Sequence, residues 1–204
     1  MGHPNAELND VYDTQPVPRA LVEEILALAS RSPSGVNTQP WLVRLLSAGR
    51  CAQLIAQTQA AWPQIAQTQA ARLYAATGST HPIPDAADDQ LPAPSAQTAA
   101  ALDAEWQHLV APVSGLCLID SRMGRGSWLD YGMFLQTWAL ACAERGLLLQ
   151  TFLAWQLADA AAQALGIAQA HERVLCGFTL GFPREPARLQ APALFRHVPR
   201  VVTV

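Results

Sequence analysis

The residues best suited to chemistry lie in one short polar run, Pro33-Ser34-Gly35-Val36-Asn37-Thr38-Gln39-Pro40-Trp41. A loop of this composition can present backbone N–H groups, the Ser34 hydroxyl and the Asn37 carboxamide to the polar edge of a ligand, while Trp41 anchors the following chain in the core. The same residue types also make an ordinary turn. The run is therefore a candidate binding loop, with a plain turn as the alternative.

Several common catalytic signatures are missing. The sequence has no Gly-x-Ser-x-Gly elbow, no His-Glu-x-x-His zinc pair and no Walker phosphate loop. A partial dinucleotide fingerprint at 124–129 lacks its third glycine. The five histidines are scattered without ligand spacing, so we expect no metal site. Any redox or group-transfer chemistry would then need an organic cofactor.

Composition excludes several partner classes. The 204 residues, half of them apolar, suit one domain with its own core. A formal charge of −3, with no stripe of basic residues, argues against nucleic acid. No run approaches the roughly 18 apolar residues that a membrane-spanning helix needs, and the first residues lack the basic and apolar regions of a signal peptide. We expect a cytoplasmic protein without a membrane or nucleic-acid partner.

The four cysteines are far apart and form no Cys-x-x-Cys motif. At least three of them sit among Leu, Ala and Val. We interpret them as small buried hydrophobic residues in a reducing compartment. They are Cys51, Cys117, Cys142 and Cys176.

A helix is expected immediately before the candidate loop. Apolar residues recur at helical spacing from Arg19 to Ala29, and Pro18 suits a helix N-terminus. The helix must stop near Ser32, because Pro33 disfavours helical geometry in the residue before it. After the loop, the apolar run from Trp41 to Leu46 predicts a buried strand.

The middle of the chain changes character twice. Residues 51–77 are helical in composition. Residues 78–97 are rich in Pro, Asp, Gly and Ser and predict a long loop, which could be a lid or a disordered insertion. The apolar segment 112–120 then predicts a strand.

A long helix is expected after the Gly-rich turn that follows this strand. Ser127, with Asp130 three residues later, is typical of a capping box. From Trp128 onward, apolar residues at helical spacing predict a buried stripe that ends near Gly146. Its members are Trp128, Tyr131, Leu135, Trp138 and Cys142.

The last third of the chain adds two strands and one helix. Residues 147–153 predict a strand or extended segment, 157–165 a helix, and 173–182 a core strand. The tail, 184–204, has several prolines and too few apolar residues for a core of its own, so it should lie along a partner or the domain surface. The alternation of helices and strands predicts an α/β sandwich around a mixed sheet.

The run from Pro33 to Trp41, placed after Pro16-Val17-Pro18 and a helix, resembles the signature of the nitroreductase family of FMN-dependent oxidoreductases. A second segment, 124–136, is similar to the family's long helix at the dimer interface and flavin pocket. Gly146-Leu147 and Leu180-Gly181-Phe182 fall where the family has its Gly-Leu and Leu-Gly-Tyr elements. The resemblance covers roughly residues 16–50 and 110–182. It implies an α/β (α+β) fold, a three-layer α/β/α sandwich around a mixed, mainly antiparallel sheet.

The resemblance also implies a set of cofactor contacts. Loop residues would contact the flavin ring and ribityl chain, and the backbone amides after the Gly-Leu element would face the flavin N5 edge, where they can stabilise negative charge. Gln136 and Thr137 occupy the place of a common Gln-Asn pair on the long helix. An ordinary core strand is the alternative for the segment after Gly-Leu. The implied residues are Pro33, Ser34, Gly35, Asn37, Gln136, Thr151, Phe152, Leu153 and Ala154.

The sequence departs from the family at its N-terminus. Family members carry an Arg-Arg-Ser-x-Arg motif for the FMN phosphate about ten residues before Pro-Val-Pro, and here those places fall on Ala6 to Asp10, with no Arg or Lys before Arg19. Charge-assisted hydrogen bonds contribute roughly 1.5–3 kcal/mol each, so losing two or three would weaken phosphate binding by several decades. A tail arginine could replace part of this cluster. Arg196 is the candidate among Arg184, Arg188, Arg196 and Arg200.

Two functions remain open. In the first, the protein is an FMN oxidoreductase that takes hydride from NAD(P)H, as a transient co-substrate, and reduces a nitro, quinone or similar conjugated acceptor in a ping-pong cycle. The flavin then carries the chemistry, and no side chain need act as acid or base. In the second, a divergent member has lost FMN binding and binds another ligand in the dimer cleft, or serves as a non-catalytic partner. The resemblance implies a homodimer, with the loop of one chain meeting the long helix and segment 151–154 of the other.

Overall fold

The structure is a computed structural model, and it describes residues 11–68, 95, 100, 109 and 111–185. Most of the expected loop or lid at 78–97 therefore lies outside the described residues. So do the segment from Ala6 to Asp10 and Arg196, and so does the tail beyond Glu185.

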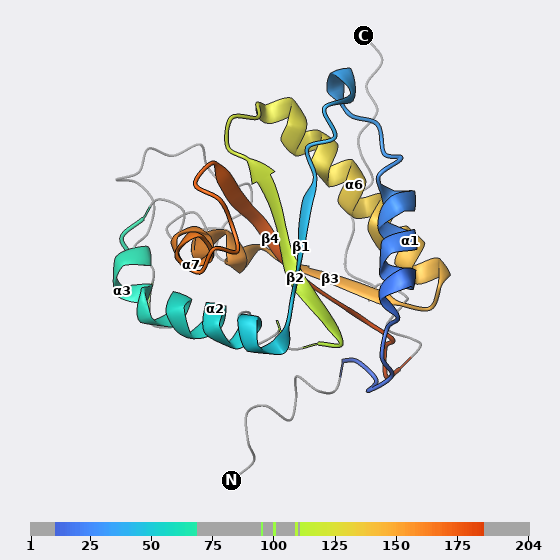
Figure 1. Ribbon diagram of the computed structural model, residues 1–204, viewed down its shortest axis with the longest axis horizontal. Coiled ribbons are helices and arrows are strands. Elements are labelled where there is room, and N and C mark those ends of the chain that lie inside the picture. The colour runs from blue at the N-terminus through green and yellow to red at the C-terminus, as the bar shows by residue number, and fades with distance from the viewer. Residues whose placement is uncertain (1–10, 69–94, 96–99, 101–108, 110, 186–204) are drawn as a thin grey trace.

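A four-stranded sheet forms the middle layer (Figure 1). Its strands are β1 (Leu42–Leu46), β2 (Val113–Asp120), β3 (Leu148–Phe152) and β4 (Glu172–Gly181). They lie in the order β1-β2-β4-β3, and all three pairings are antiparallel. This agrees with the expected mainly antiparallel character, but the sheet was also expected to be mixed, and the described strands form no parallel pair.

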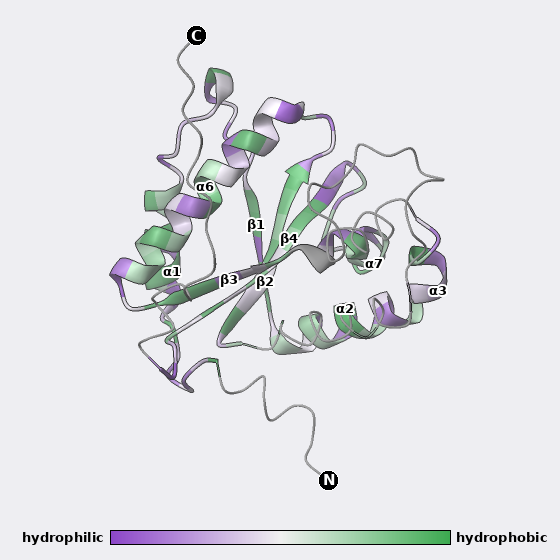
Figure 2. Ribbon diagram, turned by 180° about the vertical axis from the view of Figure 1, so that it is seen from behind, coloured by the Kyte–Doolittle hydropathy of each residue, from purple (hydrophilic) through white to green (hydrophobic). Residues whose placement is uncertain are grey.

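Helices cover both faces of the sheet, as Figures 1 and 2 show from opposite sides. On one face lie α1 (Arg19–Ala29) and α6 (Arg125–Glu144). The other face carries α2 (Ala48–Ala60), α3 (Trp62–Ile65), the 3-10 segment η4 (Leu153–Ala158) and α7 (Asp159–Ala164). The three layers confirm the expected sandwich.

The central strand β2 separates two apolar cores. Leu116 and Leu118 pack in the core beneath α2 and α7, whereas Cys117 and Ile119 pack in the core beneath α1 and α6. Successive side chains of a strand point to opposite faces, so a strand covered on both sides must be apolar throughout. Hydrophobic colouring along β2 in Figure 2 reflects this.

The expected helix before the loop and the strands are confirmed within one or two residues, and the long helix is confirmed but begins three residues before Trp128. β1 differs in burial: it pairs only with β2 among the described strands and is half-buried, because it lies at a sheet edge. The helical segment expected over 51–77 begins at Ala48 and breaks after Ala60. Pro63 explains the break, since it has no N–H for an i→i−4 hydrogen bond.

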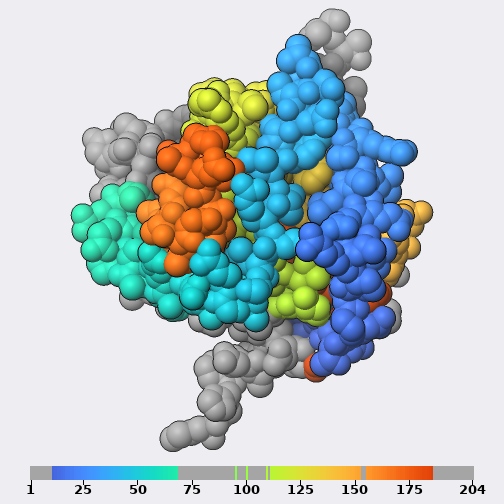
Figure 3. Space-filling model, viewed as in Figure 1, coloured from blue at the N-terminus to red at the C-terminus, as the bar shows by residue number. Residues whose placement is uncertain are grey.

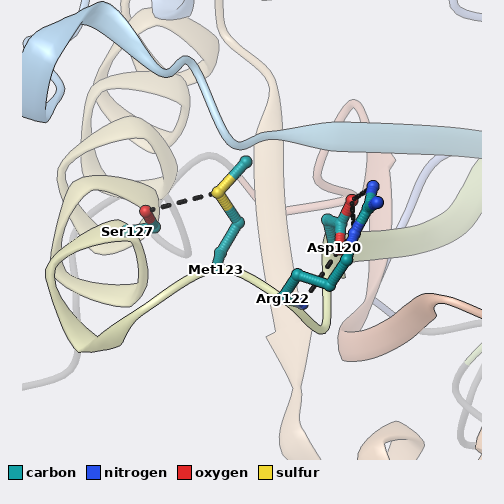
Figure 4. A network of polar contacts seen from close by, with 4 residues as sticks. All are labelled: Asp120, Arg122, Met123 and Ser127. Atoms are coloured by element: carbon teal, nitrogen blue, oxygen red, sulfur yellow. Dashed lines mark hydrogen bonds and ion pairs between the residues drawn. The ribbon is translucent and has the colours of Figure 1, made fainter.

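Two expectations about the long helix were wrong. There is no capping box: α6 begins at Arg125, and Gly124 is its N-cap without a side-chain hydrogen bond. The Ser127 hydroxyl instead donates to the Met123 sulfur, 3.7 Å away (Figure 4). Trp128 is 44% exposed, so it is not part of the buried stripe, whereas the expected members Tyr131, Trp138 and Cys142 are buried and Leu135 packs partly buried against the core. The buried face also includes Asp130, Phe134 and Ala141.

All four cysteines are buried and free, as expected. Burial raises the pKa of the Cys51 thiol to about 11 and that of Cys142 to about 12. An unfolded thiol titrates near 8.5, so from roughly that pH upward the unfolded chain loses protons that the folded chain keeps. The free energy of unfolding must therefore fall as the pH rises.

We accordingly expect the melting temperature to drop between about pH 8.5 and 11. The chain contains no lysine, so in this range the side chains that titrate are thiols and tyrosines. Thermal melts of the wild type and of a Cys51→Ala/Cys142→Ala variant across this range test the cause. The variant should show a shallower decline; an identical slope in both proteins would contradict the assignment to these thiols.

Candidate cofactor site

The candidate loop is a compact, strained turn. Its centre is the 3-10 turn η2 (Gly35–Asn37), and Val36, Asn37 and Gln39 all have positive φ, between 44° and 59°. The Ser34 hydroxyl oxygen accepts the Gln39 N–H at 3.0 Å, which closes the loop internally. Residues other than Gly, Asn and Asp rarely adopt this geometry, and such strain clusters at functional sites. This strained geometry is more typical of a binding loop than of a plain turn.

Val36 is the most unusual residue of this loop. It is β-branched, its φ and ψ are 45° and 27°, and its side chain is 98% exposed. An exposed apolar residue in a left-handed conformation adds nothing to the protein's own core and costs about 1–2 kcal/mol in backbone strain. This combination favours a side chain kept for contact with another molecule.

Replacing Val36 by Asn is expected to raise the free energy of unfolding by about 1 kcal/mol, because Asn tolerates the left-handed region. Urea unfolding of the isolated protein measures the change. Thr38→Asn is the matched control. Thr38 is exposed in the same loop but has an ordinary φ of −66°, so the free energy of unfolding of this variant should equal that of the wild type. A Val36→Asn protein no more stable than the control would argue against strain at Val36.

The loop is fixed to α6 at three points. The Asp130 carboxylate accepts the Gly35 N–H at 3.0 Å. The Ser32 hydroxyl lies 2.9 Å from the Thr137 hydroxyl, and the Trp41 ring stacks on Phe134 with centroids 5.0 Å apart and planes 9° apart. The three attachments are thus Ser32–Thr137, Gly35–Asp130 and Trp41–Phe134. Helix α6 therefore positions the loop, which lies at the margin of the molecule in Figure 3.

A charged turn leads from β2 into α6 (Figure 4). The Asp120 carboxylate accepts the Arg122 backbone N–H at 2.9 Å and its Nε–H and Nη2–H at 2.9 and 2.5 Å. These hydrogen bonds hold the pKa of Asp120 well below its usual range. The turn lets the chain reverse direction so that α6 lies back across the sheet.

The segment expected at the flavin N5 edge, residues 151–154, takes no part in the three attachments between the loop and α6. Thr151 and Phe152 end β3, where Thr151 is exposed, and Leu153 and Ala154 begin η4. The three attachments of the loop lead to α6 and involve none of these four residues. Gln136, by contrast, lies on the exposed side of α6 beside Thr137, near the loop's attachment.

Spare hydrogen-bonding groups in the loop are suited to a flavin. Because the Ser34 oxygen accepts the Gln39 N–H, its own hydroxyl proton stays available to donate. The Asn37 Oδ1 accepts from Gln39 Nε2, which leaves the Asn37 amide protons available. Neutral donors on a rigid loop fit the carbonyl and ring-nitrogen edge of an isoalloxazine. The donor set gives no contact for a phosphate, whose expected partners lie outside the described residues.

Asp130 and Ser32 were not foreseen as parts of this site. The sequence pattern around Asp130 indicated a local helix cap, and Ser32 was recognised only as the end of a helix. No local signal could have joined Gly35 to a residue 95 positions away. Among the described residues, no helix could cross a membrane, and no group of three or more His, Cys, Asp or Glu side chains could hold a metal ion.

Comparison with known proteins decides the family. The family model described as Nitroreductase family matches residues 11–182. The chain belongs to the nitroreductase family. In general terms, this membership supports an oxidoreductase of the kind that uses FMN and NAD(P)H.

Named relatives of this nitroreductase-family protein agree with the assignment. It is similar to 4-nitrobenzoate reductase from Pseudomonas putida, with 30% identity over 195 residues, 86% of this chain and 81% of the relative. Its fold matches the FMN- and NADPH-dependent nitroreductase NfnB of Sphigopyxis sp. strain HMH, with a TM-score of 0.62 and 23% identity over 98% of this chain and 96% of that one. Its fold also matches the FMN-dependent nitroreductase NfnB of Mycobacterium smegmatis, solved in complex with NADPH. The TM-score is 0.62 and the identity 20%, over 95% of this chain and 89% of that one.

Proposed function

We propose that this protein is an FMN-dependent oxidoreductase that transfers electrons from NAD(P)H to a nitro, quinone or similar conjugated acceptor. The observation that carries the proposal is the 33–39 loop: strained, exposed, fixed to α6 and equipped with unused donors. The similarity to a 4-nitrobenzoate reductase supports a nitroaromatic acceptor as the first to test.

The loop and α6 would hold the flavin ring. Ser34 and Asn37 donate hydrogen bonds to its polar edge, Pro33 and Gly35 shape the contact surface, and Gln136 lies beside them on α6. Bound FMN supplies the hydride-accepting and electron-donating chemistry, so the protein's own residues need only position it and exclude water.

The amides of segment 151–154 would complete the ring's surroundings. Backbone N–H groups at the N5 edge stabilise negative charge there without any side-chain acid. The phosphate would need a cation, and Arg196 is the proposed donor, because the places of the family's arginine motif hold Ala6 to Asp10.

A homodimer of this single-domain chain would bring the two halves of the site together. Within one chain the three attachments of the loop described above all lead to α6, and α6 exposes Trp128, Leu129 and Leu140, with Leu129 exposed by 70%. A second copy could cover this apolar face and bring its own segment 151–154 to the loop, with the tail at 184–204 lying on the partner. A monomer at micromolar concentration in sedimentation experiments would contradict this arrangement.

One observation favours a second function. Ala6 to Asp10 include two acidic residues where the family binds phosphate, which supports a divergent member that has lost FMN and binds another small molecule in the cleft, or acts as a non-catalytic partner.

The test is NAD(P)H oxidation by the protein with added FMN and 4-nitrobenzoate, with a quinone as second acceptor. We expect turnover with at least one acceptor, reduced by Asn37→Ala through weaker flavin binding. Thr38→Ala, an exposed change in the same loop, is the matched control and should leave turnover unchanged. No turnover above free FMN would favour the second function.

A further inference from the structure

A buried carboxylate reaches the candidate loop from α6. Asp130 is only 8% exposed, and its Oδ2 accepts the Gly35 N–H at 3.0 Å. Among the described residues, Asp130 takes part in no ion pair. Burying an unpaired carboxylate is costly, so packing alone would select an apolar residue here, as at its buried neighbours Tyr131 and Phe134. The polar choice therefore points to the contact with the loop.

The hydrogen bond between Asp130 and Gly35 lies at the start of the strained turn. Gly35 opens η2, and the left-handed residues Val36 and Asn37 follow directly. Fixing the Gly35 N–H therefore fixes the start of the strained turn and, with it, the direction of the Asn37 side chain. A strained turn persists only where its surroundings hold it, and the other polar attachment, Ser32 to Thr137, lies before Pro33 and outside the turn.

We infer that Asp130 is a positioning residue, which holds the 33–39 loop in the shape that binds the cofactor. The inference rests on the proposed function, since the ligand is the flavin assigned there. Asp130 acts through the Gly35 amide, so it need not touch the cofactor. A neutral acceptor of the same shape should therefore replace it, because the role needs an oxygen at that place and no negative charge.

The test compares FMN dissociation constants, measured by quenching of flavin fluorescence. Asp130→Ala should weaken FMN binding by about tenfold, as expected for losing one hydrogen bond to a charged group. Asp130→Asn, which keeps an oxygen within reach of Gly35, should stay within about threefold of the wild type. Should Asp130→Ala fail to fold, Asp130→Ser takes its place, since its hydroxyl is too short to reach the amide.

Asp159→Ala is the matched control. Asp159 also accepts one backbone N–H, that of Val174 at 2.6 Å, but it lies on α7 at the opposite face of the sheet. A merely structural role for Asp130 predicts that both alanine variants lose stability and neither changes FMN affinity. That result, or Asp130→Asn binding as weakly as Asp130→Ala, would overturn the inference.

A second readout separates this inference from the proposed function. Hydrogen–deuterium exchange at residues 33–39 of the flavin-free protein should be about tenfold faster in Asp130→Ala than in the wild type and in Asp159→Ala. If the wild type binds no FMN, the proposed function fails, but faster exchange would still establish that Asp130 holds the loop. Unchanged exchange overturns the inference whether or not FMN binds.

Discussion

The Gly177→Ala protein is expected to lose about 3 kcal/mol or more of unfolding free energy, or to fail to fold. Gly177 lies in β4, one of the two inner strands, and a Cβ there would stand 2.6 Å from Cγ and 2.8 Å from Nε1 of Trp155. Trp155 is fully buried in the core beneath α2 and α7, and protein interiors are close-packed, so its rigid ring cannot move aside without disturbing its neighbours. Urea unfolding followed by circular dichroism measures the loss.

Gly49→Ala is the control for this substitution. Gly49 lies in α2, where an added methyl group would have no atom within 4 Å, and alanine favours a helix over glycine by about 0.5–1 kcal/mol. That variant should therefore be as stable as the wild type or slightly more so. Adding Trp155→Phe to Gly177→Ala should recover part of the loss. Equal stability of Gly177→Ala and the wild type would show that the indole does not pack on this strand.

Replacing Trp41 by alanine is expected to lower both stability and flavin affinity. The Trp41 ring stacks on Phe134 of α6 and is half-buried, so its loss should cost about 2–3 kcal/mol, less than for a fully buried tryptophan. The same ring fixes the C-terminal end of the candidate loop. Its removal should free that end, and we expect FMN to bind roughly tenfold more weakly, as for the loss of about 1.4 kcal/mol.

Two variants show whether the stacking itself matters. Trp41→Phe keeps a flat ring against Phe134 and should retain most of the FMN affinity. Leu45→Ala removes an exposed apolar side chain from β1, a few residues further along the chain, and should change stability and binding little. If Trp41→Ala bound FMN as tightly as the wild type, the loop would not depend on its attachment to α6.

Local patterns in the sequence predicted most of the fold. Pro33 ended the first helix, short continuous apolar runs marked the strands, and Gly146, with a φ of 71°, marked the end of the long helix. These signals are local, because a proline or a left-handed glycine constrains the backbone at its own position. The alternation of helices and strands indicated a mixed sheet, and only its mainly antiparallel character came from the family resemblance.

Contacts between distant residues were the part that sequence reasoning missed. Ser127 and Asp130 have the spacing of a capping box, yet the carboxylate forms its hydrogen bond with Gly35, because the loop packs against that turn of α6. Trp128 fits a buried stripe by its spacing, but the helix presents it to the exterior. Helical periodicity cannot distinguish a face that packs on the sheet from one that remains open to a partner.

Parts of the site remain predictions. Ser34, Gly35 and Asn37 lie on one loop beside α6, in agreement with a shared role, whereas the role of segment 151–154 depends on a second copy of the chain. Arg196 and the segment from Ala6 to Asp10 lie outside the described residues.

The most direct measurement is the visible absorption spectrum of the protein, purified without added flavin, then incubated with excess FMN and desalted. We predict flavin absorption bands that remain with the protein after desalting and are bleached by NADH or NADPH under anaerobic conditions. A protein that stays colourless after incubation with FMN would contradict the flavoenzyme function, and the cleft would then belong to another ligand.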